Sequence, residues 1–364
     1  MIKIREKNFI SALQLFTALF ICRLIIMLTI NAQLAGGGCF IDNTVSALIA
    51  CLLNFILIIP LWLLYRRRPT LDLLDESFYL LGKFGVVICL FYAVYFICVN
   101  WYYLSFFQLF IANVMDPKTP LWLVAAAVLV VACYGAFKGV EAIMRVSGFV
   151  LIMICSGLIF IIATLVPQMD PINFEPLLYQ GPDHAAMGVV LFLSRSTGFA
   201  VMALLLPVTK GKKKLGFALW NILIYLFLTI MLVVMTGAVG DYLKTQLFPI
   251  YTASAIAEAG PFQRLDAVFL GMWMMGLFIK IALDLFLVSF CFTKIWNEKV
   301  GRVSIVAGAL FIAVVAQITT NSEKLQAIFY GPWFLFSLTA ATGLLIPLIL
   351  LIVDLAKNGR RKPV

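Results

Sequence analysis

Long apolar runs are the feature that most constrains how this chain can fold. Leucine, isoleucine, valine and phenylalanine fill one stretch after another from residue 9 to residue 353. A bilayer's hydrocarbon core is about 30 Å thick, and a helix of about 20 residues crosses it. On this criterion the sequence predicts an all-α membrane protein with ten spanning helices, at residues 9–31, 42–64, 84–111, 120–137, 143–166, 186–207, 215–238, 266–291, 302–320 and 330–353.

Composition excludes several other classes of protein. Of 364 residues, 63% are hydrophobic and 12% are charged, whereas a soluble domain has about 25% charged residues. The formal net charge is +10, but the basic residues lie in short runs between apolar spans, so we expect no nucleic-acid partner. The single histidine and eight scattered cysteines predict neither a metal site nor a disulfide framework. Nucleophile-elbow, Walker and HExxH motifs are missing, so we expect no catalytic residues, no cofactor and no enzyme.

Basic residues fall on alternate segments between the spans. One set of segments, which includes both termini, holds 20 of the 27: Lys3, Arg5, Lys7, Arg66, Arg67, Arg68, Lys83, Lys138, Arg145, Lys210, Lys212, Lys213, Lys214, Lys294, Lys299, Arg302, Lys357, Arg360, Arg361 and Lys362. The opposite set holds Lys118, Lys244, Arg264 and Lys324. The positive-inside rule therefore predicts that both termini are cytoplasmic. The first apolar run is too long for a signal peptide, so we interpret it as a retained helix.

The arrangement of the spans predicts an internal repeat within a single domain of residues 1–364. Residues 69–78, after the second span, and residues 251–258, after the seventh, both read as short helices, on opposite faces of the membrane. Two consecutive units of five helices must be inverted relative to one another, because five is odd. We expect the repeats at about 9–166 and 186–353. Transporters built this way bind their substrate near the midplane, where helices are broken.

One arginine lies inside the first helix of each predicted repeat. An ionisable residue in a span costs about 2.5–3.5 kcal/mol on insertion scales, which makes Arg23 and Arg195 functional candidates. Polar or small residues near them weaken the helix: Thr29, Ser194, Ser196, Thr197 and Gly198. One interpretation is that the arginines face a pocket and attract an anionic group such as a carboxylate. The other is that backbone carbonyls satisfy them, or that they reach an interface.

Two further groups of residues carry a weaker signal. Lys280 and Asp284 are four residues apart, so they can neutralise one another on one helix face. They are a structural ion pair or a proton- or ligand-linked switch. Asn100 and Tyr103 in the third span are either packing residues or ligand contacts.

Several runs in order resemble the spore germination permease family, the B subunits of nutrient germinant receptors. They are 119–122 (TPLW), 138–145 (KGVEAIMR), 170–178 (DPINFEPLL), Pro207, 248–251 (FPIY), 263–267 (QRLDA) and a span with Trp273 and Lys280. The resemblance extends from about residue 8 to residue 355. The resemblance rests on the order and spacing of these runs and not on any single run.

The resemblance implies the amino acid–polyamine–organocation superfamily and its leucine-transporter-like fold, a 5+5 inverted repeat. It implies a subunit of the spore inner membrane that binds a nutrient, commonly an amino acid, with an A-type membrane subunit and a C-type lipoprotein as partners. Its ligand site would lie between spans 1, 3, 6 and 8, near residues 24–29, 100–103 and 194–199 and Trp273. The chain departs from the family where a glycine is usual in span 1 and a Gly-Glu pair in span 6.

Three functions therefore stay open. The first is a nutrient-sensing receptor subunit without catalysis, in which the ligand stabilises one of two packings of the bundle. The second is a secondary transporter of amino acids or organic anions, coupled to protons through Lys280 and Asp284 or the arginines. The third is a scaffold subunit with a vestigial pocket.

Overall fold

The protein is a bundle of long helices. A computed structural model describes residues 10–27, 39–175, 177–178, 181–257 and 265–358. The helices are α1 (Ala12–Met27), α2 (Asp42–Leu57), α3 (Ile59–Arg67), α4 (Leu73–Leu81), α5 (Gly85–Phe110), α6 (Leu121–Lys138), α7 (Val140–Leu165), α8 (Pro182–Ser194), α9 (Gly198–Leu205), α10 (Lys213–Val239), α11 (Pro249–Ile256), α12 (Asp266–Ile295), α13 (Glu298–Thr320), α14 (Glu323–Phe329), α15 (Pro332–Ala340) and α16 (Ile346–Asn358).

Membrane-crossing helices account for most of these elements. Within the described ranges, nine continuous helical stretches are long and apolar enough to cross a bilayer, and Ala12–Ile25 is a shorter apolar helix. Together they match the ten predicted spans. Each apolar run becomes a helix because backbone N–H and C=O groups find no partner in lipid, so a spanning segment must satisfy them internally.

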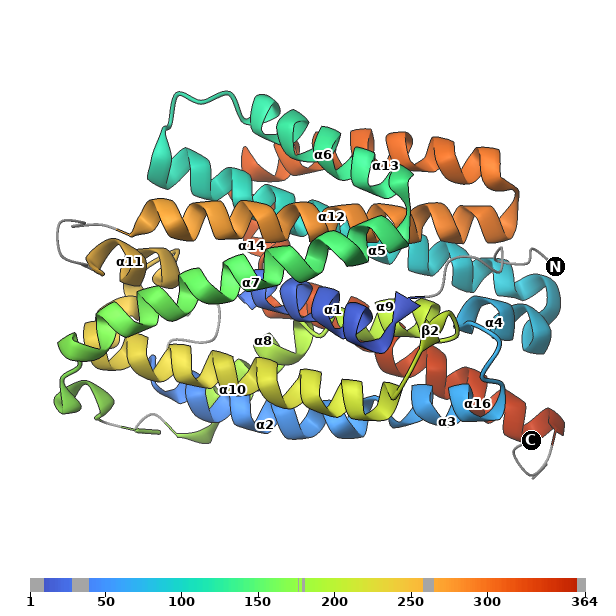
Figure 1. Ribbon diagram of the computed structural model, residues 1–364, viewed down its shortest axis with the longest axis horizontal. Helices are drawn as coiled ribbons and strands as arrows, with labels where there is room; N and C mark the ends of the chain where they lie inside the picture. Colours follow the sequence, from blue (N-terminus) through green and yellow to red (C-terminus); the bar gives the residue numbers. More distant parts are fainter. Residues whose placement is uncertain (1–9, 28–38, 176, 179–180, 258–264, 359–364) are drawn as a thin grey trace.

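The bundle has a central group of helices and two flanking groups. In Figure 1, α1, α8 and α9 lie in the middle, α5, α6, α12 and α13 on one side, and α2, α3 and α10 on the other. Burial agrees with this placement: 94% of the residues in the apolar window of α8–α9 are buried, against 28% in that of α6. The first helix of the second predicted repeat is therefore the most enclosed of the nine long apolar helices in the described part of the chain.

The predicted loop helices both form, at opposite ends of the bundle. Helix α4 begins after Asp72, whose side chain accepts a hydrogen bond from the N–H of Asp75 as an N-cap. Helix α11 begins at Pro249. Figure 1 shows α4 at the right end, beside α3 and α16, and α11 at the left end. We call the end that holds α4 the basic end, because Arg66–Arg68 and the α12–α13 connection also lie there. At this end β1 (Ile10–Ser11) pairs in parallel with β2 (Thr209–Lys210).

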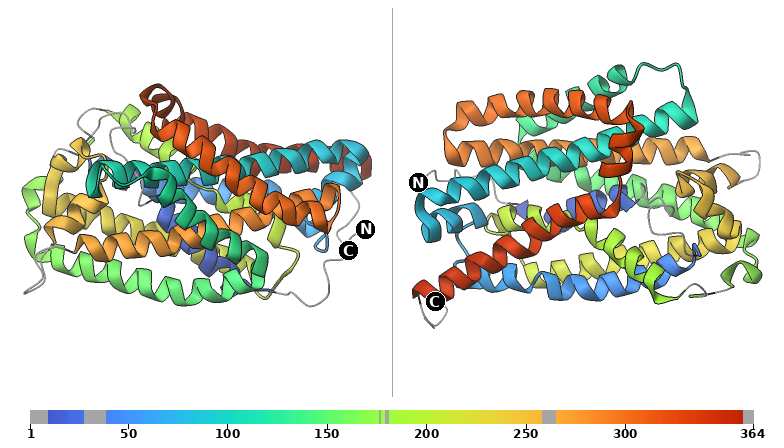
Figure 2. Two further views of the ribbon diagram at one scale, coloured as in Figure 1. Left: turned by 90° about the horizontal axis from the view of Figure 1, so that it is seen from above. Right: turned by 180° about the vertical axis from the view of Figure 1, so that it is seen from behind.

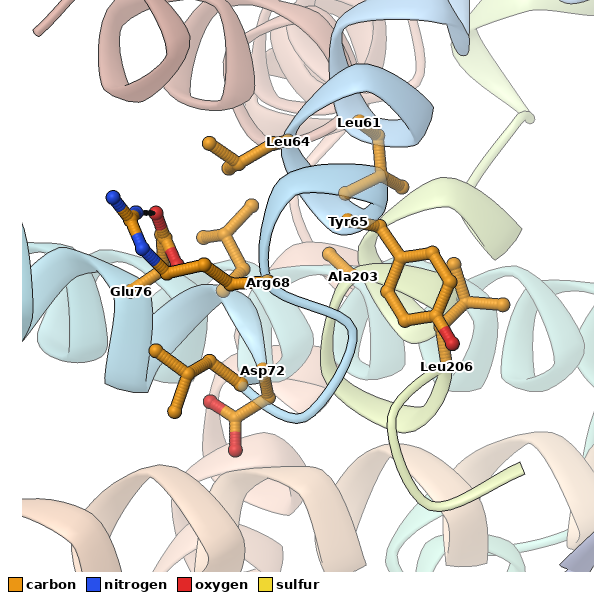
Figure 3. A pocket seen from close by; sticks show the side chains of 10 residues that line it. Leu61, Leu64, Tyr65, Arg68, Asp72, Glu76, Ala203 and Leu206 are labelled. Atoms are coloured by element: carbon orange, nitrogen blue, oxygen red, sulfur yellow. Dashed lines mark hydrogen bonds and ion pairs between the residues drawn. The ribbon is translucent and has the colours of Figure 1, made fainter. Parts of the chain in front are cut away.

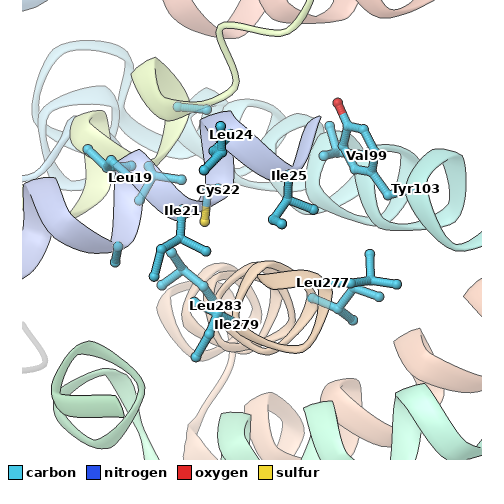
Figure 4. Packing of buried hydrophobic residues seen from close by; sticks show 14 of the residues in the cluster. Leu19, Ile21, Cys22, Leu24, Ile25, Val99, Tyr103, Leu277, Ile279 and Leu283 are labelled. Atoms are coloured by element: carbon cyan, nitrogen blue, oxygen red, sulfur yellow. The ribbon is translucent and has the colours of Figure 1, made fainter. Parts of the chain in front are cut away.

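Helix α1 packs on α7, α10 and α12. Cys22 and Ile25 of α1 face Leu277 and Leu283 of α12 in Figure 4. Gly276 allows this contact, because a Cβ there would overlap the side chain of Ile25. The apolar side of α1 is thus fixed against α12, and its other side carries Arg23 toward the α8–α9 break.

Candidate functional site

The break between α8 and α9 frees backbone carbonyls inside the bundle. The helix tightens into a turn in which the N–H of Ser196 donates to the carbonyl of Leu193 at 2.9 Å. Side chains from three elements then bond other carbonyls of this turn. The predicted weak point at 194–198 is therefore a real break, satisfied by side chains as a buried helix end requires.

Arg23 reaches this break from α1. Its exposed fraction is 2%. Nη1 donates to the hydroxyl of Ser196 at 2.9 Å, and Nη2 donates to the carbonyl of Phe192 at 2.7 Å and to the hydroxyl of Tyr225. The arginine thus joins α1 to the break and to α10.

Arg195 lies in the break itself and is completely buried. Its Nη1 donates to the hydroxyl of Ser194 at 2.9 Å and to the carbonyl of Leu191 at 3.3 Å. Nη2 donates to the hydroxyl of Tyr102 on α5 at 3.0 Å. Arg195 therefore points toward α5, whereas Arg23 bonds to α10.

All of these acceptors are neutral, so they satisfy hydrogen bonds without compensating charge. In the part of the chain that the structure describes, neither arginine forms an ion pair with a carboxylate. The Nε of each has no hydrogen-bond partner there. The two guanidinium groups also interact electrostatically with one another. Two buried positive charges that repel one another are unfavourable unless an anion neutralises them.

Tyr103 lies within the electrostatic reach of both arginines. Its ring is 5.1 Å from that of Tyr102, centroid to centroid, and its side chain points from α5 toward α1 in Figure 4. Its buried hydroxyl has no partner among the described residues, and neither do the amide oxygen and nitrogen of Asn100. Asn100 precedes Tyr103 by three residues, so both lie on one face of α5. We call Arg23, Arg195, Tyr103 and Asn100 the arginine site.

A group of hydrogen-bonded polar side chains beside Arg23 was not predicted from the sequence. Asn54 on α2 donates to the hydroxyl of Tyr225 at 3.0 Å and to Oδ1 of Asn221 at 3.2 Å. The hydroxyl of Ser196 donates to Oδ1 of Asn54 at 3.1 Å. Asn54 and Asn221 are the signal that could have revealed it, because each is an amide within an apolar span.

A cavity of about 80 Å³ lies beside the break, between α2, α9 and α15. Ser196 and Thr339 contribute the polar atoms nearest the turn, and Leu57, Leu193, Phe199, Phe336 and Gly343 are among the residues of its wall. This volume is large enough to hold a few waters. The break therefore has free space on one side.

Lys280 and Asp284 form an ion pair on α12. Nζ lies 2.5 Å from Oδ2, and both side chains are at most 1% exposed. Oδ1 of Asp284 has no hydrogen-bond partner among the residues described. The pair interacts electrostatically with Cys22, which precedes Arg23 on α1. The structure thus places this predicted pair near α1.

The structure brings together most of the residues that the sequence proposed. Arg23 bonds to Ser196 and Arg195 bonds to Ser194, so these four residues all lie at the break, in two hydrogen-bonded groups. Thr197 and Gly198 are buried where α9 begins, and a Cβ on Gly198 would lie 3.3 Å from the ring of Trp220, so they act in packing. Thr29 lies outside the described residues. Trp273 belongs to an aromatic cluster, 4.9 Å from Phe110 between ring centroids.

Comparison with known proteins gives a consistent picture. A spore germination protein KB of Bacillus subtilis (strain 168) is 25% identical over 98% of this chain and 97% of its own length. A putative spore germination protein, YfkT, of the same organism is 24% identical over 84% of this chain and 86% of its own. Spore germination protein XB of Bacillus anthracis is 24% identical over 71% of this chain and 72% of its own.

Among solved structures, the substrate-bound, outward-open state of a Na⁺-coupled sialic acid symporter is similar in fold. Its TM-score is 0.59 at 12% identity, over 96% of this chain and 84% of that one. The likeness supports the predicted leucine-transporter-like fold. The family model described as spore germination protein matches residues 9–325. The chain belongs to the spore germination protein family, and it is an integral membrane protein with a transporter-like fold.

Proposed function

We propose that this protein is the nutrient-sensing membrane subunit of a germinant receptor and that it binds a small molecule through a carboxylate. The carboxylate would lie between α1, α5 and the α8–α9 break, against Arg23 and Arg195. Asn100 and the hydroxyl of Tyr103 would bond the same ligand. Binding would stabilise one packing of the bundle and thereby signal.

The observation that carries this proposal is the pair of buried guanidinium groups without a carboxylate partner in the described ranges. Arginine pairs with a carboxylate in a bidentate geometry that neutral hydroxyls cannot reproduce. The unpartnered Nε atoms and the unpartnered hydroxyl of Tyr103 offer further donors. An amino acid or other small carboxylate has the charge and size that this group of donors recognises.

A thermal-shift screen of the purified full-length protein tests the proposal. L-Amino acids would be compared with their carboxamides, such as L-alanine with L-alaninamide, because the amide keeps the shape and removes the charge. A ligand at 100 times its Kd stabilises the protein by about 2.7 kcal/mol. We expect at least one amino acid to raise the melting temperature and its amide to have little effect.

Variants connect this result to the arginines. Arg195→Gln and Arg23→Gln should each weaken binding of that amino acid by about 10- to 100-fold, the range for a charge-assisted hydrogen bond. Arg302→Gln is the matched control, because Arg302 is an exposed arginine on α13. Equal binding of acid and amide, or unchanged affinity in both arginine variants, would overturn the proposal.

Secondary transport is the second candidate, and the buried Lys280–Asp284 pair favours it. Intramembrane ion pairs of this kind occur in proton relays of transporters. Uptake of the same radiolabelled amino acid into proteoliposomes separates the two functions. Binding without saturable uptake supports the receptor, whereas pH-driven uptake that Lys280→Met abolishes supports the transporter. The absence of both binding and uptake supports the scaffold.

The remaining predictions from the family resemblance belong to the same proposal. We propose an A-type membrane subunit and a C-type lipoprotein as partners in the spore inner membrane. We also propose cytoplasmic termini, a single domain with repeats at about 9–166 and 186–353, and a ligand site near the midplane. Reporter fusions at the two termini test the orientation.

A further inference from the structure

One bent helical rod connects the break to the basic end of the bundle. Helix α15, the π-helical turn η7 (Ala341–Leu345) and α16 follow one another without interruption from Pro332 to Asn358. Figure 2 shows this rod from behind, running from the middle of the bundle to the end where α16 finishes. Pro347 and the π-helical turn separate its two halves. π-Helical turns are rare and are frequent at functional sites.

The first half of the rod contacts the broken helix directly. The hydroxyl of Thr339 donates to the carbonyl of Ser194 at 2.9 Å. Gly343 lies so close to α9 that a Cβ there would be 3.1 Å from Phe199. The hydroxyl of Tyr92 on α5 donates to the carbonyl of Thr342 at 2.6 Å, within the π-helical turn. The rod is therefore attached to both sides of the break.

The second half of the rod ends in charged contacts with α3 and α4. Asp354 is 1% exposed and pairs with Arg67 at 2.8 Å and with Arg68 at 2.5 Å. Arg68 also pairs with Glu76 of α4, as Figure 3 shows. Nζ of Lys357 donates to the carbonyl of Leu80 at 2.6 Å. We call these residues the α16 network.

Free space lies at both ends of this path. The cavity of about 80 Å³ lies between the break and α15 beside their direct contact, with Ser196 and Thr339 in its wall. A smaller void of about 20 Å³ lies beside Arg68, Asp72 and Glu76, against Ala203 and Leu206 near the end of α9 (Figure 3). Packed elements need such space to change between discrete arrangements.

From these contacts we propose that the α15–α16 rod transmits the state of the break to α4 at the basic end, through Thr339 at one end and Asp354 at the other. A ligand that draws Arg195 and Ser194 toward itself moves the carbonyl to which Thr339 donates. The rod then shifts Asp354 relative to Arg67 and Arg68. The inference rests on the proposed function only in assigning the ligand to the break.

Hydrogen–deuterium exchange of the full-length protein in nanodiscs tests the connection without any ligand. Thr339→Val removes the hydroxyl bonded to Ser194 and keeps the shape. We expect amide exchange in residues 73–81 of α4 to rise by about 2- to 13-fold, the range for loss of one hydrogen bond. Thr339→Ser should restore wild-type exchange.

A matched control lies on the same helix. The hydroxyl of Ser337 is exposed and donates only within α15, to Phe334 at 2.9 Å, so Ser337→Ala should leave α4 unchanged. Because coupling is reciprocal, Asp354→Asn should raise exchange in residues 191–199, whereas Glu141→Gln, in an exposed ion pair on α7, should not.

The inference is overturned if Thr339→Val changes exchange only around residues 191–199 and 335–345, or if Asp354→Asn leaves 191–199 unchanged. This result is independent of ligand binding. If the protein binds no carboxylate but shows both exchange effects, the proposed ligand is wrong and the proposed role of the rod is supported. If the protein binds a carboxylate but shows neither exchange effect, the ligand site is supported and the proposed role of the rod is wrong.

Discussion

The hydroxyl of Ser196 lies 2.9 Å from Nη1 of Arg23, although 173 residues separate them in the sequence. This contact joins the first helix of one half to the broken helix of the other. Ser196 also donates to Asn54, so one hydroxyl links three elements. The serine is therefore the position at which a charge can be introduced directly against the arginine.

Ser196→Asp should supply the carboxylate that we propose for the ligand. A hydrogen bond to a charged group contributes about 1.5–3 kcal/mol, against about 0.5–1.5 kcal/mol for a bond between neutral groups. We expect a higher melting temperature than in Ser196→Asn, which has the same size and no charge, and loss of amino-acid binding. Binding that survives in Ser196→Asp, with no gain in stability over Ser196→Asn, would contradict the proposed charge compensation.

Two tyrosines near the arginines should behave differently. Tyr225 accepts from Arg23 and from Asn54, so Tyr225→Phe should lower the free energy of unfolding by about 1–3 kcal/mol. The hydroxyl of Tyr103 has no partner in the described part of the chain. Tyr103→Phe should leave unliganded stability nearly unchanged and weaken ligand binding. Chemical denaturation and ligand titration of both variants check this difference.

The Lys280–Asp284 pair should show strong thermodynamic coupling. Removing one partner leaves an uncompensated buried charge, which costs about 3–5 kcal/mol. Lys280→Met and Asp284→Leu should each be strongly destabilising, and the double variant should recover much of the loss. Additive losses in the double variant would show that the two side chains do not depend on each other.

Asp72, just before α4, gives a prediction about pH. Burial raises the pKa of Asp72 to about 6, although the Lys294 ammonium 2.9 Å away opposes the shift. The folded state therefore holds the proton more tightly than the unfolded chain, whose pKa is about 3.9. The resulting stability is complete below the unfolded pKa and is lost as pH rises through 6.

Asp72→Asn should remove this dependence, because asparagine can still cap α4 and has no charge to lose. Lys294 keeps Asp75 as a partner at 2.5 Å. We expect the melting temperature of the wild type, relative to the variant, to fall between pH 4 and pH 7. If the melting temperatures of the wild type and the variant change in parallel over this pH range, Asp72 does not titrate in the folded protein.

Hydropathy was sufficient to predict the helices, because length and lipid solvation decide where a spanning segment begins and ends. The break at 194–198 was also predictable, since an arginine between two serines cannot remain in an apolar helix without partners. The partners themselves were not predictable. Tyr225, Asn54 and Asp354 contact residues more than 140 positions away, and no local pattern specifies such pairs.

The most direct test of ligand binding at the arginine site is an experimental structure of the protein saturated with the amino acid that stabilises it most. The account predicts that the carboxylate contacts the guanidinium groups of Arg23 and Arg195, with the hydroxyl of Tyr103 within hydrogen-bond distance. A ligand bound elsewhere, with both arginines still bonded only to carbonyls and hydroxyls, would contradict it.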